Sequence, residues 1–295
     1  MKTVDDQLRA GSIAALATPF LPGGEGIDEL AWRQLLAWHA DAGTAGVVVS
    51  GTTGESATTT AEERDRLLEH AVESAGSRLD VIAGTGSAST AIAVKQSRRA
   101  ADLGATAVLV ATPYYNRPPQ RGLLAHYREI ADDCPVPVIL YNVPSRTAVD
   151  LEPETVLALA AHSNVVAIKE AVPEMHRVEA YAEAGLAVYS GDDPSALEAM
   201  RHGARGVISV AANVVPRAMA RMCAHADAGE FEAAEEIDSK LRALYRFLCA
   251  EPNPVPLKWM LATLGKMGPD LRLPLVPMDP RHHAAGLELA RTLRE

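Results

Sequence analysis

The runs Ala107-Val-Leu-Val110, Val138-Ile-Leu140 and Val165-Val-Ala-Ile168 decide the fold that the sequence predicts. Each run is short, continuous and apolar, which is typical of a parallel strand that is buried on both faces. Five further runs of the same kind lie at residues 12–17, 46–50, 81–83, 187–189 and 206–209. Longer stretches with apolar residues at helical spacing separate the runs, so strands and helices are expected to alternate along the chain.

Eight strands that alternate with helices predict an α/β protein, a (β/α)₈ TIM barrel with right-handed crossovers. The pattern changes after residue 209, because the rest of the chain contains no further strand-like run. An apolar stripe over residues 231–248, a stretch at 257–264 and another at 281–293 predict helices, with a proline-rich break at 252–256. We therefore expect a catalytic barrel over residues 1–225 and a small C-terminal helical domain over residues 226–295.

Composition limits the classes of protein to which the chain can belong. It has 295 residues, of which 48% are hydrophobic and 22% are charged, so it can bury a substantial core and is not expected to be disordered. The formal net charge is −10. An acidic chain repels phosphate backbones and anionic lipid headgroups, so neither nucleic acid nor a membrane surface is an expected partner.

Three cysteines and the absence of long apolar runs indicate the compartment. Cys134, Cys223 and Cys249 are far apart and form no CxxC pair, which is typical of free thiols in a reducing environment. Residues 1–10 carry several charges and no apolar core of a secretion signal, and no run reaches the roughly 20 residues of a membrane span. A cytoplasmic location is expected.

Lys169 is the most informative single residue. Active sites of (β/α)₈ barrels lie at the carboxyl ends of the strands, and Lys169 directly follows the run 165–168. Partial burial at the barrel mouth would disfavour the ammonium form, and a neutral amine can attack a ketone to form an imine. The alternative is a lysine that ends a strand and extends to solvent, which is the more common case on position alone. The neighbouring residues decide between the two.

Several of those neighbours carry hydroxyl groups. Tyr141, Thr52 and Tyr115 follow three other strands, and a phenol or hydroxyl can pass protons to and from a reacting group. A lone tyrosine would more often be a packed core aromatic. Three hydroxyl groups that converge with a lysine on one face of the barrel favour a catalytic role.

Two further features could hold a carboxylate. The loop Gly51-Thr-Thr-Gly54 presents backbone N–H groups that can form an anion nest, although an ordinary turn explains the same pattern. Arg146 offers a fork-shaped donor just after the fifth expected strand, and its alternative is a surface ion pair.

Metal binding has little support in the sequence. None of the nine histidines forms an HxH, HxxxH or HExxH pattern. Asp192 and Asp193 could bind a cation, but they are better explained as the N-cap of a helix over residues 194–200, which begins with a proline. No metal is expected.

Seven segments, taken together, resemble the dihydrodipicolinate synthase and N-acetylneuraminate lyase superfamily. They occur in the superfamily's order along nearly the whole chain, which is more specific than any one of them. The segments are GTTGES at 51–56, TPYYNRP at 112–118, YNVPSRT at 141–147, IKEA at 168–171, SGDD at 190–193, GVISVAANV at 206–214 and EPNPVPLKW at 251–259.

The likeness is greater to the dihydrodipicolinate synthase branch. Lyases for sialic acid usually have a serine in place of Thr52 and lack the YNVPSRT form with its arginine. The resemblance implies a class I aldolase, a lyase that condenses pyruvate with L-aspartate 4-semialdehyde to 4-hydroxy-tetrahydrodipicolinate. This product is the precursor of diaminopimelate and lysine.

The resemblance also implies the chemical role of each catalytic group. Lys169 forms the Schiff base with pyruvate, so no external cofactor is needed. Tyr141, Thr52 and Tyr115 form a proton relay, in which Tyr115 reaches across a dimer interface into the site of the neighbouring subunit. The family further suggests a homotetramer built as a dimer of dimers.

The substrate-binding positions follow in the same way. Thr53 holds the carboxylate of pyruvate and Arg146 that of the semialdehyde. Gly191 and Ile208 line the pyruvate site.

One region departs from the members of the family that L-lysine inhibits. Arg64, Ala88 and Ile92 stand where those enzymes have a histidine or similar residue, an asparagine and a glutamate. Without a carboxylate at position 92 the inhibitor's ammonium group has no anionic partner, and Arg64 adds a like charge. We expect L-lysine to inhibit weakly or not at all.

Two other functions are compatible with the same residues. The first is a pyruvate-dependent aldolase of the same superfamily that acts on a sugar acid or another keto acid. The second, from a different class, is a catalytically inactive barrel that binds a small molecule. The choice of aldehyde separates the first from the expected enzyme, and a covalent pyruvate adduct excludes the second.

Overall fold

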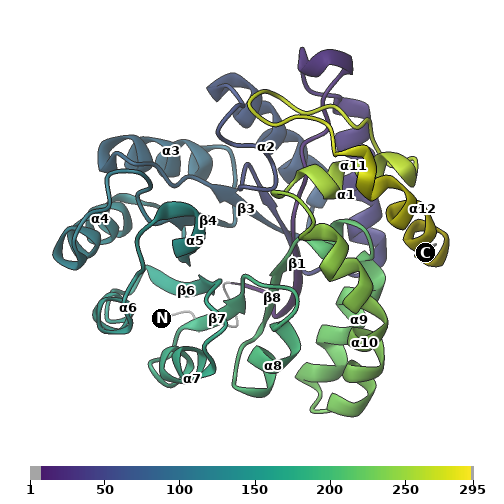
Figure 1. Ribbon diagram of the computed structural model, residues 1–295. Helices are drawn as coiled ribbons and strands as arrows, with labels where there is room; N and C mark the ends of the chain where they lie inside the picture. The colour runs from purple at the N-terminus through teal and green to yellow at the C-terminus, as the bar shows by residue number, and fades with distance from the viewer. Residues whose placement is uncertain (1–7, 294–295) are drawn as a thin grey trace.

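The computed structural model describes residues 8–293, and its centre is a closed barrel of eight parallel strands. Each strand pairs with its neighbours in the sequence, and β8 closes the barrel on β1 (Figure 1). The strands are β1 Gly11–Ala15, β2 Gly46–Val49, β3 Asp80–Gly84, β4 Ala107–Ala111, β5 Val138–Asn142, β6 Val165–Glu170, β7 Ala187–Ser190 and β8 Gly206–Ser209. The predicted (β/α)₈ fold is confirmed. Residues 1–7, part of the segment expected to lack a secretion signal, lie outside the described residues.

Helices surround the barrel, and α9 packs beside β1 and β8 (Figure 1). The start of α2 follows a local rule, since Thr60 and Glu63 form a reciprocal capping box there. The helices that follow the strands are α1 Glu29–Ala42, α2 Ala61–Ala75, α3 Thr90–Asp102, α4 Gln120–Asp133, α5 Pro144–Thr147, α6 Pro153–Ala160, α7 Met175–Glu183, α8 Ala196–Arg201 and α9 Pro216–Asp227.

The core has two layers that follow from the alternation of side chains along each strand. One set of buried residues, among them Ile13, Ile82 and Ile139, clusters inside the barrel, and a larger set packs between the strands and the helices. Gly206 lets β8 approach β1 closely, because a Cβ atom at that position would lie 2.0 Å from the carbonyl oxygen of Gly11. A side chain at residue 206 would therefore oppose closure of the barrel.

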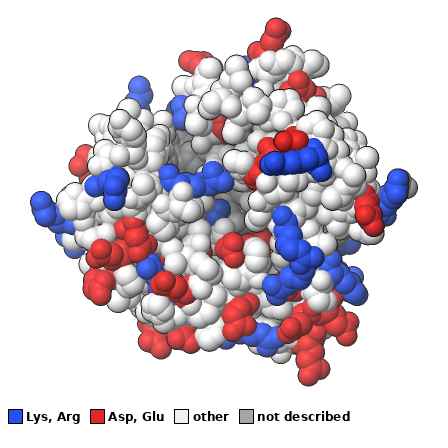
Figure 2. Space-filling view, viewed as in Figure 1, with Lys and Arg blue, Asp and Glu red and all other residues white. Residues whose placement is uncertain are grey.

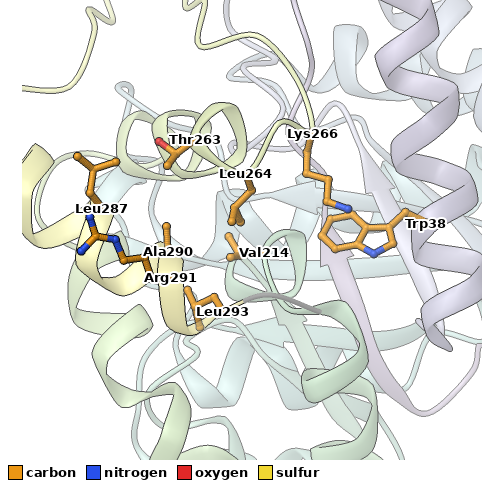
Figure 3. A pocket seen from close by; sticks show the side chains of 9 residues that line it. All are labelled: Trp38, Val214, Thr263, Leu264, Lys266, Leu287, Ala290, Arg291 and Leu293. Carbon is orange, nitrogen blue, oxygen red and sulfur yellow. The ribbon is translucent and has the colours of Figure 1, made fainter.

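The predicted helical extension is also confirmed, and consists of α10 Phe231–Leu248, α11 Val255–Thr263 and α12 His283–Thr292. It packs beside the barrel and leaves a cavity of 480 Å³ between α1, α11 and α12 (Figure 3). There the Nζ atom of Lys266 lies 3.9 Å from the centroid of a Trp38 ring, an arrangement that favours a cation–π contact. The domain boundary expected after residue 225 falls in the last turn of α9 and stays a prediction.

Two observations bear on the environment of the chain. Within residues 8–293, no helix combines the length and the apolar character that crossing a membrane would require. The three cysteines are free thiols, of which Cys134 and Cys223 are buried, as predicted from their spacing.

Candidate active site

A cavity of 440 Å³ opens at the carboxyl ends of β2, β4 and β5. Three of the residues proposed from the sequence line it together: Thr52, Tyr141 and Arg146. Segments of the C-terminal extension, residues 252–254 and 274–275, line it as well. Figure 2 shows a hollow near the middle of the face that is viewed in Figure 1, with basic side chains at its edge. The barrel and the extension therefore enclose the site jointly.

Lys169 lies on β6, and only 6% of its surface is exposed. Its register partner on β5 is Tyr141, and its Nζ atom lies over the Tyr141 ring, 4.5 Å from the centroid. Lys169 is not among the residues that line the cavity, whereas Tyr141 is, so the amine packs against the cavity wall. The apolar surroundings and the aromatic face favour a lysine that is held in place rather than extended to solvent.

Gly191 follows β7 and lies near Lys169, whereas Ile208 lies inside the barrel on β8. A Cβ atom at Gly191 would come within 3.1 Å of Cε of Lys169 and 2.9 Å of Cβ of Ala171, so a side chain there would crowd the lysine. Ile208 is buried on β8 in the same inner cluster as Tyr141. Neither residue is among those that line the cavity.

Thr53 is a buried residue of the loop that follows β2. Its hydroxyl oxygen accepts a hydrogen bond from Nδ2 of Asn253 at 3.0 Å, so a residue of the extension holds it. The loop is a compact turn in which the backbone N–H of Gly54 donates to the carbonyl of Gly51 at 3.1 Å. This turn presents Thr52 to the cavity and keeps Thr53 below it.

Arg146 is an exposed residue of the short helix α5 at the edge of the cavity. None of the carboxylates in residues 8–293 forms a salt bridge with it. Its guanidinium group is therefore available to a ligand, which favours the substrate-binding interpretation over a surface ion pair.

Tyr115 lies apart from the other predicted residues. It is 94% exposed, has a φ of 73° and does not line the cavity of its own chain, whereas the adjacent Tyr114 does. A non-glycine residue in the left-handed region and a fully exposed tyrosine are both uncommon. This placement is compatible with a side chain that serves a second subunit.

Behind the lysine, four buried or partly buried polar side chains form a network that the sequence analysis missed. Nδ2 of Asn142 donates to Oε1 and Oε2 of Glu170 at 3.0 and 3.1 Å and to Oδ1 of Asp150 at 2.8 Å. Both terminal nitrogens of Arg177 donate to the Asp150 carboxylate. Burial raises the pKa of Glu170 to about 7, against the hydrogen bonds from Val172 and Asn142.

The network lies under the segment that carries Arg146. The backbone N–H of Leu151 donates to Oδ1 of Asn142 at 3.0 Å, which ties the chain after α5 back to the end of β5. Two pairs of adjacent residues, Tyr141-Asn142 and Lys169-Glu170, could have revealed this network from the sequence. Adjacent side chains on a strand point to opposite faces, so a polar residue beside each reactive one predicts a polar cluster on the other face.

The helix after β7 begins later than predicted. We expected residues 194–200 with Asp192 and Asp193 as caps, but α8 spans Ala196–Arg201. Asp192 accepts hydrogen bonds from the N–H and the hydroxyl of Ser195. Asp193 instead accepts from the backbone N–H groups of Val210 and Ala211, so a contact with the end of β8 overrides the local cap.

Within residues 8–293, no three His, Cys, Asp or Glu side chains are grouped so as to hold a metal ion.

Comparison with known proteins places this chain in a family. The model of the dihydrodipicolinate synthetase family matches residues 8–293. The chain belongs to the dihydrodipicolinate synthetase family. The family that the sequence motifs suggested is therefore confirmed.

Individual relatives agree over nearly their full length. A 4-hydroxy-tetrahydrodipicolinate synthase of Stenotrophomonas maltophilia is 50% identical over 284 residues, which cover 95% of each chain. The crystal structure of the chloride-inhibited dihydrodipicolinate synthase of Acinetobacter baumannii, complexed with pyruvate, has a TM-score of 0.92 at 42% identity and covers 96% of this chain and 99% of its own. A monomeric dihydrodipicolinate synthase variant has a TM-score of 0.91 at 37% identity, with 97% and 95% covered.

Proposed function

We propose that this member of the family condenses pyruvate with L-aspartate 4-semialdehyde to 4-hydroxy-tetrahydrodipicolinate, through a Schiff base on Lys169. The chain is a lyase that acts in lysine and diaminopimelate biosynthesis, an activity supported by the family match and by relatives at about 50% identity. The observation that carries the mechanism is the position of Lys169, buried on β6 with its Nζ atom over the ring of Tyr141.

The first steps activate pyruvate. The amine of Lys169 attacks the ketone carbon, and loss of water gives an iminium ion. The iminium withdraws electrons from the methyl group of pyruvate, and removal of one methyl proton gives an enamine. Tyr141 and Thr52, which line the same cavity, supply hydroxyl groups for this proton transfer, together with Tyr115 from a neighbouring subunit.

The later steps build the ring. The enamine carbon attacks the aldehyde carbon of the semialdehyde, and the aldehyde oxygen takes up a proton. The amino group of the semialdehyde then attacks the iminium carbon and displaces the amine of Lys169. Arg146, which has no carboxylate partner in residues 8–293, binds the carboxylate of the semialdehyde, and Thr53 binds that of pyruvate.

The proposal includes an oligomer and a compartment. A relay that contains Tyr115 needs at least a dimer, because this side chain is exposed and lies outside its own cavity. We propose a homotetramer made of two such dimers, although a monomeric variant exists among the structural relatives. A cytoplasmic location is supported by the three free cysteines.

Reduction with borohydride tests the central step. Borohydride added to the enzyme with pyruvate should leave a reduced pyruvyl group on the peptide that contains Lys169, detected by mass spectrometry. A Lys169→Ala variant should remain unmodified. An adduct on another lysine, or none in the wild-type enzyme, would contradict the mechanism.

A panel of aldehydes tests the substrate. The enzyme should consume pyruvate with L-aspartate 4-semialdehyde and should show little turnover with sugar aldehydes. Turnover of sugar-acid substrates in the absence of activity toward the semialdehyde would refute the proposed reaction while leaving the Schiff base intact.

A further inference from the structure

A buried ion pair joins helix α11 of the extension to the loop that follows β2. The Nζ atom of Lys258, whose exposed fraction is 0%, donates to Oε1 of Glu55 at 2.7 Å. The other carboxylate oxygen of Glu55 accepts from the backbone N–H of Arg272 at 3.2 Å. Neither Lys258 nor Glu55 takes part in the steps proposed above.

Glu55 ends the turn that carries Thr52 and Thr53. Its backbone N–H donates to the carbonyl of Thr52 at 3.1 Å, and its φ of 52° lies in the left-handed region, which is unfavourable for a residue with a Cβ atom. A strained residue of this kind keeps its conformation when tertiary contacts hold it. The anchored carboxylate of Glu55 supplies such a contact.

A second link from the same part of the extension reaches the same turn. Asn253, two residues before α11, donates from Nδ2 to the hydroxyl of Thr53 at 3.0 Å. The segment 253–258 therefore holds the turn at two points, the Thr53 hydroxyl and the Glu55 carboxylate. Thr52 lies in the same turn and faces the cavity.

Stability alone is a poor explanation for this ion pair. Burial of two charges costs free energy that their attraction repays only in part, and apolar replacements of buried pairs are often neutral. The Phe20 ring offsets part of the cost, since its centroid lies 4.1 Å from Nζ of Lys258 and 4.2 Å from Cζ of Arg272. The pair differs from an apolar contact in that it fixes the direction of the Glu55 side chain, and through it the turn.

We propose that Lys258 and Glu55 are positioning residues whose ion pair sets the geometry of the Thr52–Thr53 turn for proton transfer. The extension, and not the barrel alone, then determines where the relay hydroxyl of Thr52 lies. This inference rests on the proposed function, because it assigns a consequence to the roles of Thr52 and Thr53.

The test separates a loss of geometry from a loss of folded enzyme. Exchange of the methyl hydrogens of pyruvate for deuterium in D₂O, followed by NMR, reports proton removal at the iminium stage. Reduction with borohydride and pyruvate counts the sites that can form the Schiff base. Exchange rate divided by site number gives a rate per competent site, which a purely structural defect leaves unchanged.

The main variant is the double substitution Lys258→Met with Glu55→Gln, which removes both charges at similar volume. It should keep a melting temperature close to that of the wild type, while the exchange rate per site falls by about tenfold or more. Glu55→Asp keeps the charge but shortens the arm by one methylene, and should lower the same rate by about fivefold. This second variant decides the matter if the double variant does not fold.

Glu63→Gln is the matched control. Its carboxylate binds the guanidinium group of Arg272 at 2.5 and 2.6 Å, so it also links the extension to the region after β2, but it makes no hydrogen bond to Thr52 or Thr53. It should lower the melting temperature and leave the rate per site unchanged.

Rates per site within twofold of the wild type in the double variant, or in Glu55→Asp, would overturn the inference. A wild-type enzyme that forms no pyruvyl adduct on Lys169 would overturn the proposed function and this inference together. A wild-type enzyme with a normal adduct and unaffected variants would overturn this inference alone.

Discussion

The amine of Lys169 lies 4.5 Å from the centre of the Tyr141 ring, and the two residues are register partners on the neighbouring strands β5 and β6. The strand ladder thus places the proposed Schiff-base lysine next to a hydroxyl-bearing ring that lines the cavity. The ring and the hydroxyl of Tyr141 have separable effects, because the ring packs against the lysine while the hydroxyl serves the proton relay.

Tyr141→Phe should separate these effects. The phenylalanine ring keeps the contact with Lys169, so the pyruvyl adduct should still form after reduction and the melting temperature should change little. Turnover should fall by about 100-fold or more because a proton-transfer group is lost. Steady-state assays and adduct mass spectrometry check this, and near-normal turnover would remove Tyr141 from the relay.

Tyr115→Phe should lower turnover without destabilising the fold, because the side chain is 94% exposed in the single chain. A mixing experiment identifies the subunit that it serves. If Tyr115 acts across an interface, coexpressed Lys169→Ala and Tyr115→Phe chains should regain roughly a quarter of wild-type activity, from hybrid dimers with one intact site. Absence of recovery in proven hybrids would show that Tyr115 does not act between subunits.

Arg146→Ala should weaken binding of the semialdehyde selectively. Loss of a charge-assisted hydrogen bond costs about 1.5–3 kcal/mol, so the KM for the semialdehyde should rise by roughly 10- to 100-fold. The KM for pyruvate should change little. Arg146→Lys keeps the charge and should recover part of the loss, and an equal effect on both substrates would argue against a role in aldehyde selection.

L-Lysine should not inhibit at concentrations near one millimolar. Arg64 and Ile92 line a second cavity of 420 Å³ between α2 and α3, where Ile92 is half-exposed and offers no carboxylate to an ammonium group. Ile92→Glu combined with Arg64→His should create sensitivity, because it adds an anionic partner and removes a positive charge. An inhibition constant of about a millimolar or below in the wild type would contradict this interpretation of the cavity.

Glu170 should make stability depend on pH. Burial raises its pKa from 4.5 to about 7 in the folded chain, so between these values the unfolded chain releases a proton that the folded chain keeps. The free energy of unfolding should therefore fall as pH rises through this window, by about 3 kcal/mol from this residue, with no further loss above it. Urea unfolding at several pH values checks the slope.

Glu170→Gln should remove this contribution. The difference in unfolding free energy between wild type and variant should change by about 3 kcal/mol between pH 4.5 and pH 7, whatever the constant offset from altered hydrogen bonds. The exposed Glu154→Gln should leave the slope as it is in the wild type. Parallel curves for Glu170→Gln and wild type would show that folding does not shift the pKa of this carboxyl.

The local pattern of apolar residues was sufficient to predict the fold. It placed the ends of two strands too early, because polar residues continue those strands. The apolar run 165–168 lies within β6, and the stripe at 231–248 coincides with α10. The expected fifth and sixth strands ended at Leu140 and Ile168, yet β5 and β6 extend two residues further. The strands continue because their backbones stay paired, Tyr141 with Lys169 and Asn142 with Glu170. A pattern of apolar residues does not indicate this pairing.

The sequence by itself determined the order of the strands, the family, and the reactive residues at the strand ends, because a period of two or 3.6 residues records which side of each element is buried. Only the tertiary structure decided that the extension completes the site. Asn253 meets Thr53 across 200 residues and Lys258 meets Glu55 across 203. No local periodicity encodes such contacts, because the partner of a buried charge depends on which distant segment packs against it.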